Sequence, residues 1–137
     1  MKTSGYSSTP LAKKLGIKEN FSIKLVNEPE HYFRLLADLP TEYKLVKDSK
    51  TKVDFIHYFT TESTKLLNDL PKLKQQLLAN GMIWVSWPKK TSKVETDVNE
   101  NIIRDLALSI GLVDIKVCAV DEVWSGLKLV IPVKDRK

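Results

Sequence analysis

The most constraining feature of the sequence is a run of six residues, 82–87, in which only Ser86 is polar. A strand with one solvent face alternates apolar and polar residues, so a nearly continuous apolar run is typical of a strand covered on both faces. Such strands lie at the centre of parallel sheets that carry helices on both sides. The run therefore predicts an α/β protein built around a buried central strand.

Strand and helix patterns alternate on either side of this run. Period-two apolar residues predict strands, and apolar residues at helical spacing predict helices. Only Asp121 and Glu122 separate the last two strands, which predicts a tight antiparallel reversal. The predicted strands cover residues 21–27, 43–47, 53–59, 82–87, 113–120 and 123–133, and the predicted helices cover residues 11–15, 29–36, 61–79 and 98–110.

Particular residues set the predicted helix boundaries. Thr9 is placed to cap helix 11–15, and Gly16 to end it. Pro71 is expected to kink or divide helix 61–79, and Gly81 to end it. The whole pattern predicts one α/β domain over residues 1–137: a three-layer sandwich with a mostly parallel sheet and a C-terminal antiparallel hairpin, preceded by an N-terminal arm and short helix over residues 1–19.

Charge and hydropathy narrow the class of protein. The chain has 22 basic and 17 acidic residues, a formal charge of +5, and only three of the basic residues are arginines. Bidentate reading of base edges belongs to arginine, so sequence-specific nucleic-acid recognition is disfavoured. No apolar stretch approaches the roughly 18 residues of a membrane helix. We therefore expect a cytoplasmic protein with neither a nucleic-acid nor a membrane partner.

Metal and nucleophilic chemistry have few candidate residues. Cys118 is the only cysteine, and His31 and His57 are the only histidines, so neither an internal disulfide nor a thiolate metal site is expected. His57 lies inside strand 53–59, where a histidine satisfied within the core is more common than a catalytic base. Cys118 lies inside a strand, which predicts a buried, inert thiol. No catalytic residue can be assigned from the sequence.

The strand ends indicate where a ligand would bind. Ligands of open parallel sheets bind beyond the carboxyl ends of the strands. This rule selects Asn27 and Glu28 after the first strand, Thr60 and Thr61 after the third, and the segments after the central strand and at the hairpin turn. We expect the last two to form an aromatic, charge-paired cleft for a small polar or anionic ligand or a protein partner. Its candidate residues are Trp87, Lys89, Lys90, Lys93, Asp121, Glu122, Trp124 and Ser125.

Other interpretations of these residues stay open. The lysines can simply neutralise Asp121 and Glu122 while the tryptophans close the core. Alternatively, Asp121 or Glu122 acts as the base of a divergent transferase and the lysines hold an anionic substrate. The dispersed lysines would also allow weak, salt-sensitive nucleic-acid binding without sequence preference.

A nucleotide cofactor is not expected. A dinucleotide or cofactor loop needs glycines after the first strand, where the backbone approaches the phosphate. Residues 27–30 read Asn-Glu-Pro-Glu. Two carboxylates there would repel a phosphate, and the proline removes one backbone amide.

Three segments carry a family resemblance: SGYSSTPLAKKLGIK, MIWVSWPKKTSKVETD and GLVDIKVCAVDEVWSGLKLV. They resemble an uncharacterised bacterial family, domain of unknown function 3052, for which no reaction is assigned. The order of the later elements also resembles the second half of class I methyltransferases that use S-adenosylmethionine. That resemblance implies a truncated methyltransferase-like fold, but the glycine-rich motif of those enzymes would fall at residues 27–30 and is absent.

Overall fold

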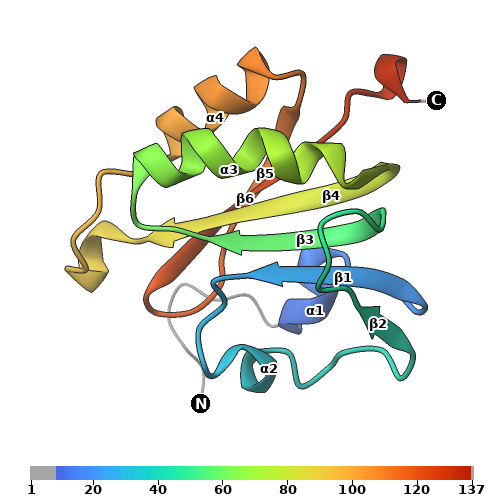
Figure 1. Ribbon diagram of the computed structural model, residues 1–137. Helices are drawn as coiled ribbons and strands as arrows, with labels where there is room; N and C mark the ends of the chain where they lie inside the picture. Colours follow the sequence, from blue (N-terminus) through green and yellow to red (C-terminus); the bar gives the residue numbers. More distant parts are fainter. Residues whose placement is uncertain (1–8, 137) are drawn as a thin grey trace.

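The computed structural model describes residues 9–136, which form three layers (Figure 1). The predicted arm over residues 1–8 lies outside the described part. The strands are β1 (Phe21–Val26), β2 (Tyr43–Leu45), β3 (Val53–Phe59), β4 (Leu77–Pro88), β5 (Val113–Ala119) and β6 (Trp124–Val130); the helices are α1 (Leu11–Leu15), α2 (Tyr32–Leu35), α3 (Ser63–Gln75) and α4 (Glu100–Ser109), with 3-10 turns η1 (Lys90–Ser92) and η2 (Val133–Asp135).

One six-stranded sheet forms the middle layer, in the order β2-β1-β3-β4-β6-β5. Strands β2, β1, β3 and β4 are parallel, and β6 is antiparallel to both β4 and β5. Helices α3 and α4 lie over one face of the sheet, and α1 and α2 lie on the other side (Figure 1). The predicted α/β sandwich with a C-terminal antiparallel hairpin is confirmed.

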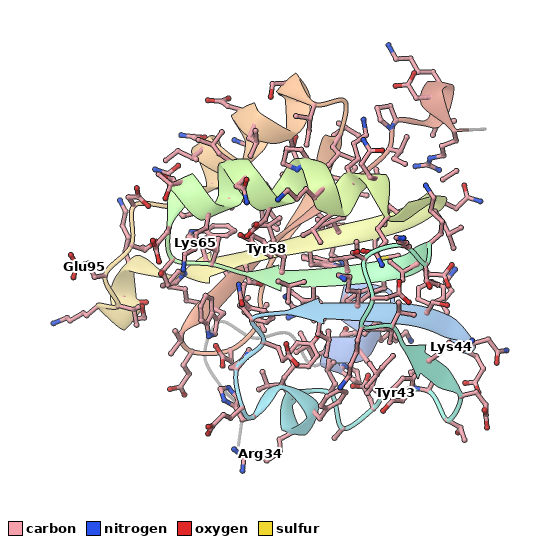
Figure 2. All side chains as sticks on the ribbon, viewed as in Figure 1. Arg34, Tyr43, Lys44, Tyr58, Lys65 and Glu95 are labelled. Atoms are coloured by element: carbon pink, nitrogen blue, oxygen red, sulfur yellow. The ribbon has the colours of Figure 1, made fainter. Side chains whose placement is uncertain are left out.

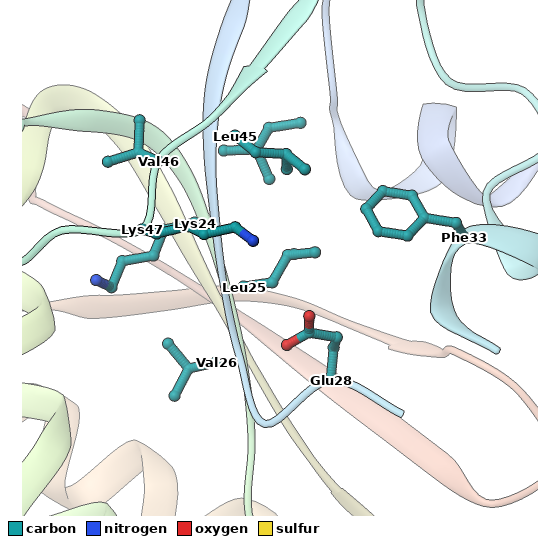
Figure 3. A pocket seen from close by; sticks show the side chains of 9 residues that line it. Lys24, Leu25, Val26, Glu28, Phe33, Leu45, Val46 and Lys47 are labelled. Carbon is teal, nitrogen blue, oxygen red and sulfur yellow. The ribbon is translucent and has the colours of Figure 1, made fainter. Parts of the chain in front are cut away.

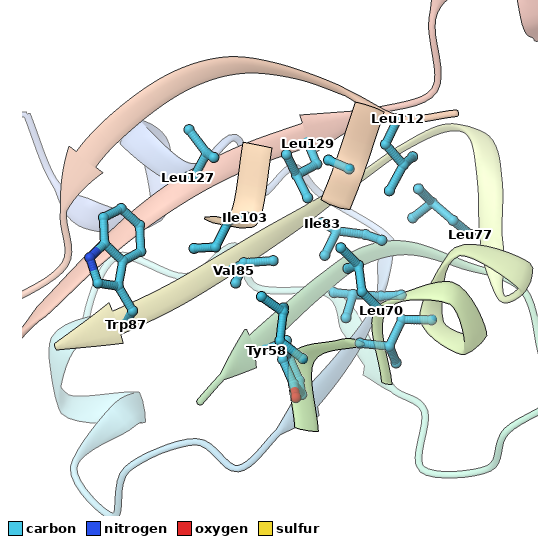
Figure 4. Packing of buried hydrophobic residues seen from close by; sticks show 14 of the residues in the cluster. Tyr58, Leu70, Leu77, Ile83, Val85, Trp87, Ile103, Leu112, Leu127 and Leu129 are labelled. Carbon is cyan, nitrogen blue, oxygen red and sulfur yellow. The ribbon is translucent and has the colours of Figure 1, made fainter. Parts of the chain in front are cut away.

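Strand β4 is the central strand that the apolar run predicts. Residues 81–88 are all buried, and their side chains alternate between two separate cores. Ile83 and Val85 pack with Leu70 and Ile103 in the core beneath α3 and α4 (Figure 4). Trp84 belongs to the opposite core, which the first two helices cover.

Helix α1 is held by a cap from a distant residue. The two carboxylate oxygens of Asp38 accept hydrogen bonds from the backbone amides of Ala12 (3.1 Å) and Lys13 (3.2 Å). The sequence predicts Thr9 as the cap, but local spacing could not reveal an acceptor 26 positions away. The predicted stop is confirmed, because Gly16 has a left-handed φ of 89°.

Removal of this cap provides a first test of the fold. We expect Asp38→Ala to lower the free energy of unfolding by about 0.5–2 kcal/mol, the usual cost of losing a helix cap. Asp38→Asn keeps one acceptor oxygen and should lose less. Asp105→Ala, which removes an exposed carboxylate from α4, is the control. Equal losses in urea denaturation for Asp38→Ala and Asp105→Ala would show that the cap contributes nothing.

The boundary between α3 and β4 differs from the prediction. Helix α3 contains Pro71 and ends at Gln75 instead of residue 79, and Gly81 lies within β4 instead of ending the helix. The side-chain amide of Gln76 donates to the carbonyls of Asp48 (2.9 Å) and Thr51 (2.8 Å), which fixes the chain at the helix exit. A Cβ at Gly81 would approach the Asp54 carbonyl to 2.9 Å, so close backbone packing requires this glycine.

Candidate functional site

The topological switch point of the sheet lies between β1 and β3. The chain leaves β1 for β2 on one side, then returns past β1 to add β3 on the other side. Ligands of open α/β sheets bind at such a point, beyond the carboxyl ends of the strands. A hollow of about 230 Å³ lies there, and we call it the switch-point hollow. It is lined by Asn27, Phe59, Thr60, Thr61, Glu62, Lys65 and Trp124.

Asn27 occupies the position where a nucleotide loop would begin. Its φ of 60° is left-handed, a conformation that asparagine tolerates better than most residues. Its side-chain amide donates to the Phe59 carbonyl (3.2 Å), so it bridges the ends of β1 and β3. The following helix, α2, has only four residues. A side chain therefore joins the two strand ends at the position where a nucleotide loop would begin.

Trp124 and Lys65 give the switch-point hollow an aromatic and a cationic wall. The Trp124 ring meets Phe59 edge to face, with centroids 5.1 Å apart and planes at 90°. Lys65 lies on α3 near the carboxyl end of β3 (Figure 2). Its Nζ is 3.3 Å from a Glu62 carboxylate oxygen, and both side chains are more than half exposed. Because this ion pair is exposed, it contributes little stability and can exchange for another anion.

The two predicted site tryptophans lie on opposite faces of the sheet. Trp87 is 8% exposed and packs in the core beneath α3 and α4, at the end of β4 (Figure 4). Trp124 packs against the other core. The β4–β6 register pairs Trp87 with Ser125 and Pro88 with Trp124, so the two rings are offset by one residue and point apart. Both tryptophans lie at the same edge of the sheet, but they do not line a common cleft.

Four other predicted site residues lie in the loop after β4 or in the hairpin turn, and these two segments are in contact. The backbone amide of Lys89 donates to the Val123 carbonyl (2.7 Å). Lys90 begins η1, and Lys93 ends it with a φ of 62°. Glu122 is exposed in the turn. We call Lys89, Lys90, Lys93 and Glu122 the polar rim; they follow β4 or lie in the hairpin turn, and none of them lines the switch-point hollow.

Asp121 has a structural role that its sequence position did not reveal. One carboxylate oxygen accepts from the amides of Val123 and Trp124 (both 2.8 Å), which holds the hairpin turn. The other oxygen is 2.9 Å from His31 Nε2. Both oxygens are therefore bonded, and Asp121 joins the hairpin turn to the start of α2.

His57 is the satisfied core histidine that its strand position predicts. Its Nδ1 is 2.8 Å from the Tyr32 hydroxyl, and its Nε2 is 2.8 Å from the Ser86 hydroxyl. A neutral imidazole donates one of these bonds and accepts the other. Complete burial lowers the pKa of His57 to about 3, and burial also raises the pKa of Tyr32. The sequence signal that was missed is Ser86, the polar residue inside the apolar run.

Cys118 is half-buried, and burial raises the pKa of its thiol, partly offset by Lys14 and Lys116. A raised pKa reduces the thiolate fraction and hence the reactivity. The predicted inert character is supported, although the side chain is less buried than expected.

A second hollow, of about 370 Å³, lies at the open edge of the sheet beside β1 and β2 (Figure 3). Sequence reasoning missed it, because it forms where residues 46–52 connect β2 to β3 without a helix. Phe33 faces Leu25 and Leu45, and these three side chains are part of the apolar lining (Figure 3). The charged residues Lys24, Glu28 and Lys47 also line this hollow.

The family model described as "Protein of unknown function (DUF3052)" matches residues 32–133, most of the chain. The chain belongs to the DUF3052 family. The predicted resemblance to this family is thus confirmed, and the match includes the second and third of the segments that carry it. No curated protein is significantly similar to this DUF3052 chain in sequence. No helix in residues 9–136 has the length and apolar character needed to cross a bilayer.

Solved structures similar to this DUF3052 chain include methyltransferases. A SAM-dependent methyltransferase from Aquifex aeolicus has a TM-score of 0.60 at 16% identity, over 88% of this chain and 87% of that one. Magnesium protoporphyrin IX methyltransferase from Synechocystis PCC 6803, with bound SAM, has a TM-score of 0.58 at 8% identity, over 88% and 74%. A pericyclic reaction enzyme has a TM-score of 0.52 at 12% identity, over 90% and 47%. The fold is methyltransferase-like.

The described residues do not fit S-adenosylmethionine at the switch point. Asn27 bridges the strand ends where a cofactor loop needs glycine backbone. The switch-point hollow, at about 230 Å³, is also smaller than the roughly 300–1,000 Å³ pockets that enclose drug-sized ligands, the size class of this cofactor. Fold similarity carries no activity by itself.

Proposed function

We propose that this DUF3052 protein is a non-catalytic, methyltransferase-like module that binds a small ligand at the carboxyl edge of its sheet, in the switch-point hollow. The observation that carries the proposal is that Asn27, Lys65 and Trp124 converge from three separate elements on a hollow at the switch point. An indole wall favours a planar group, and an exposed lysine favours an anionic one. The ligand class is therefore a small planar anion.

The remaining candidate residues have distinct parts in this proposal. Lys89, Lys90, Lys93 and Glu122 form the rim, where the exposed part of a ligand or a partner protein would contact the edge. Trp87 and Asp121 act by positioning: Trp87 anchors the end of β4, and Asp121 fixes the turn that presents Trp124. Ser125 lines a different hollow, beside α1 and β5.

Benzoate and its neutral analogue benzamide are suitable probes. We expect benzoate to shift the NMR resonance of the Trp124 indole N–H, and Lys65→Met to weaken benzoate binding about fivefold while leaving benzamide binding unchanged. Lys72→Met, which removes an exposed lysine further along α3, is the matched control. The proposal would be contradicted if the Trp124 resonance responded to neither probe, or if benzoate bound the wild type and Lys65→Met equally well.

Calorimetry with adenosylmethionine and its demethylated product separates this function from a transferase. We expect no binding of either, because Asn27 fills the place of the glycine loop. Tight binding would restore the divergent-transferase hypothesis, in which the rim lysines hold an anionic substrate.

A further inference from the structure

Five lysines gather on the outer side of α1, β5 and β6, away from the switch-point hollow. We call this surface the lysine face. Two residues come from α1, one from the segment that follows it, and one from each strand of the terminal hairpin. They are Lys13, Lys14, Lys18, Lys116 and Lys128.

Hydrogen bonds and strand register bring these lysines together. Lys14 Nζ donates to the Ala119 carbonyl (3.4 Å), and Lys116 Nζ donates to the Lys14 carbonyl (3.2 Å), which joins α1 to β5. Lys116 lies directly opposite Lys128 in the antiparallel pair. The Lys128 Nζ lies beside Gly16, 3.6 Å from where a Cβ would stand, so this charge is also next to α1.

No lysine of this cluster forms an ion pair with a carboxylate within the described residues. The ion pairs found in residues 9–136 involve His31, Lys65 and Arg104, and none includes a lysine of the lysine face. Asp121 lines an adjoining hollow with Lys14, but both of its oxygens are bonded elsewhere. Like charges opposite each other destabilise a strand pair. Burial, together with Lys116 and Lys18, lowers the pKa of Lys128.

A hollow of about 720 Å³ adjoins the cluster. Lys13, Lys14 and Lys116 line it, together with the hydroxyl residues Thr9 and Ser125. Its volume lies within the roughly 300–1,000 Å³ range of small-molecule sites. Within residues 9–136 its lining contains no arginine and no aromatic ring, so this part of the chain supplies no stacking platform of the kind with which proteins bind single-stranded nucleic acid.

We propose that the lysine face binds a small ligand that carries several phosphate groups, seated in this hollow between α1 and β5. Lysine ammonium groups bind phosphate as point charges, and a multiply charged anion would relieve the repulsion between Lys116 and Lys128. The site is separate from the switch-point hollow, and either site can exist without the other.

Inorganic tripolyphosphate is the probe for this site. In calorimetry with the full chain at low salt, we expect binding that Lys13→Met and Lys116→Met each weaken about fivefold, because each removes a charge that lines the hollow. Lys72→Met, on the opposite face of the sheet, should bind tripolyphosphate like the wild type. Added salt should weaken binding in every protein.

The melting temperature of the ligand-free protein tests the repulsion between Lys116 and Lys128 directly. Without ligand, Lys128→Met should raise the melting temperature by about 1–3 °C, because it removes one charge of the cross-strand pair. Absence of tripolyphosphate binding, or equal binding in the lysine-face variants and Lys72→Met, would overturn the proposal. Binding of a short DNA duplex without binding of tripolyphosphate would also overturn it, by assigning the face to nucleic acid.

Discussion

Trp84→Ala is expected to lower the free energy of unfolding by about 3–5 kcal/mol, the usual cost of deleting a large aromatic side chain from a core. Trp84 is completely buried in the core that α1 and α2 cover. Its indole N–H donates to the Leu15 carbonyl (2.8 Å), so the side chain also anchors the end of α1. Gly126 leaves room for the ring, since a Cβ there would lie 3.0 Å from it.

Urea denaturation of three variants separates the contributions of Trp84. Trp84→Phe keeps most of the apolar volume but leaves the Leu15 carbonyl unpaired, and should lose about 1–3 kcal/mol. Trp124→Phe, at a half-buried ring, is the control and should lose less than Trp84→Ala. A loss below about 1 kcal/mol for Trp84→Ala would show that the core described around β4 is incorrect.

The second large effect is a loss of stability at acidic pH caused by His57. Its pKa is about 3 in the folded protein, compared with about 6.5 in an unfolded chain. Between these values the unfolded state binds a proton that the folded state does not bind. The full contribution is therefore present above about pH 6.5 and is lost as pH falls toward 3, with a slope of about 1.4 kcal/mol per pH unit.

Denaturation midpoints measured between about pH 7 and pH 4.5 test this linkage. We expect the wild type to lose about 2.5 kcal/mol over that interval. His57→Gln should be less stable at neutral pH, because Tyr32 and Ser86 lose their partner, but its stability should change little over the same interval. An unchanged slope in His57→Gln would assign the pH effect to other groups.

The sequence predicts the layers of the fold better than its local boundaries. The bounds of strand 53–59 are confirmed, because large apolar residues fill it and polar residues flank it. The exit of helix α3 is not predicted, because leucines at 73, 77 and 78 suit both a helical stripe and the start of a strand. The choice depends on Gln76, whose side chain finds two carbonyls from a distant loop.

For the candidate site, too, the sequence predicts the general location better than the detailed arrangement of the side chains. The carboxyl-edge rule places Asn27, Thr60 and Trp124 at one end of the sheet, as the hollow confirms. It cannot say on which face a side chain of the hairpin lies, because that depends on register. Trp87 and Trp124 are offset by one residue in the β4–β6 register, and this offset places their side chains on opposite faces of the sheet.

The lysine of the outermost strand has a consequence for the behaviour of the protein in concentrated solution. Strand β5 is an edge strand of the sheet, and within the described part of the chain Ile115 and Val117, which flank Lys116 in the sequence, are each more than 45% exposed. The unpaired backbone N–H and C=O groups of an edge strand can pair with a strand of another molecule, and such pairing can begin a fibril. The charge of Lys116, in the middle of β5, opposes this pairing between molecules. Lys116 therefore destabilises the hairpin through its repulsion with Lys128 and at the same time disfavours aggregation.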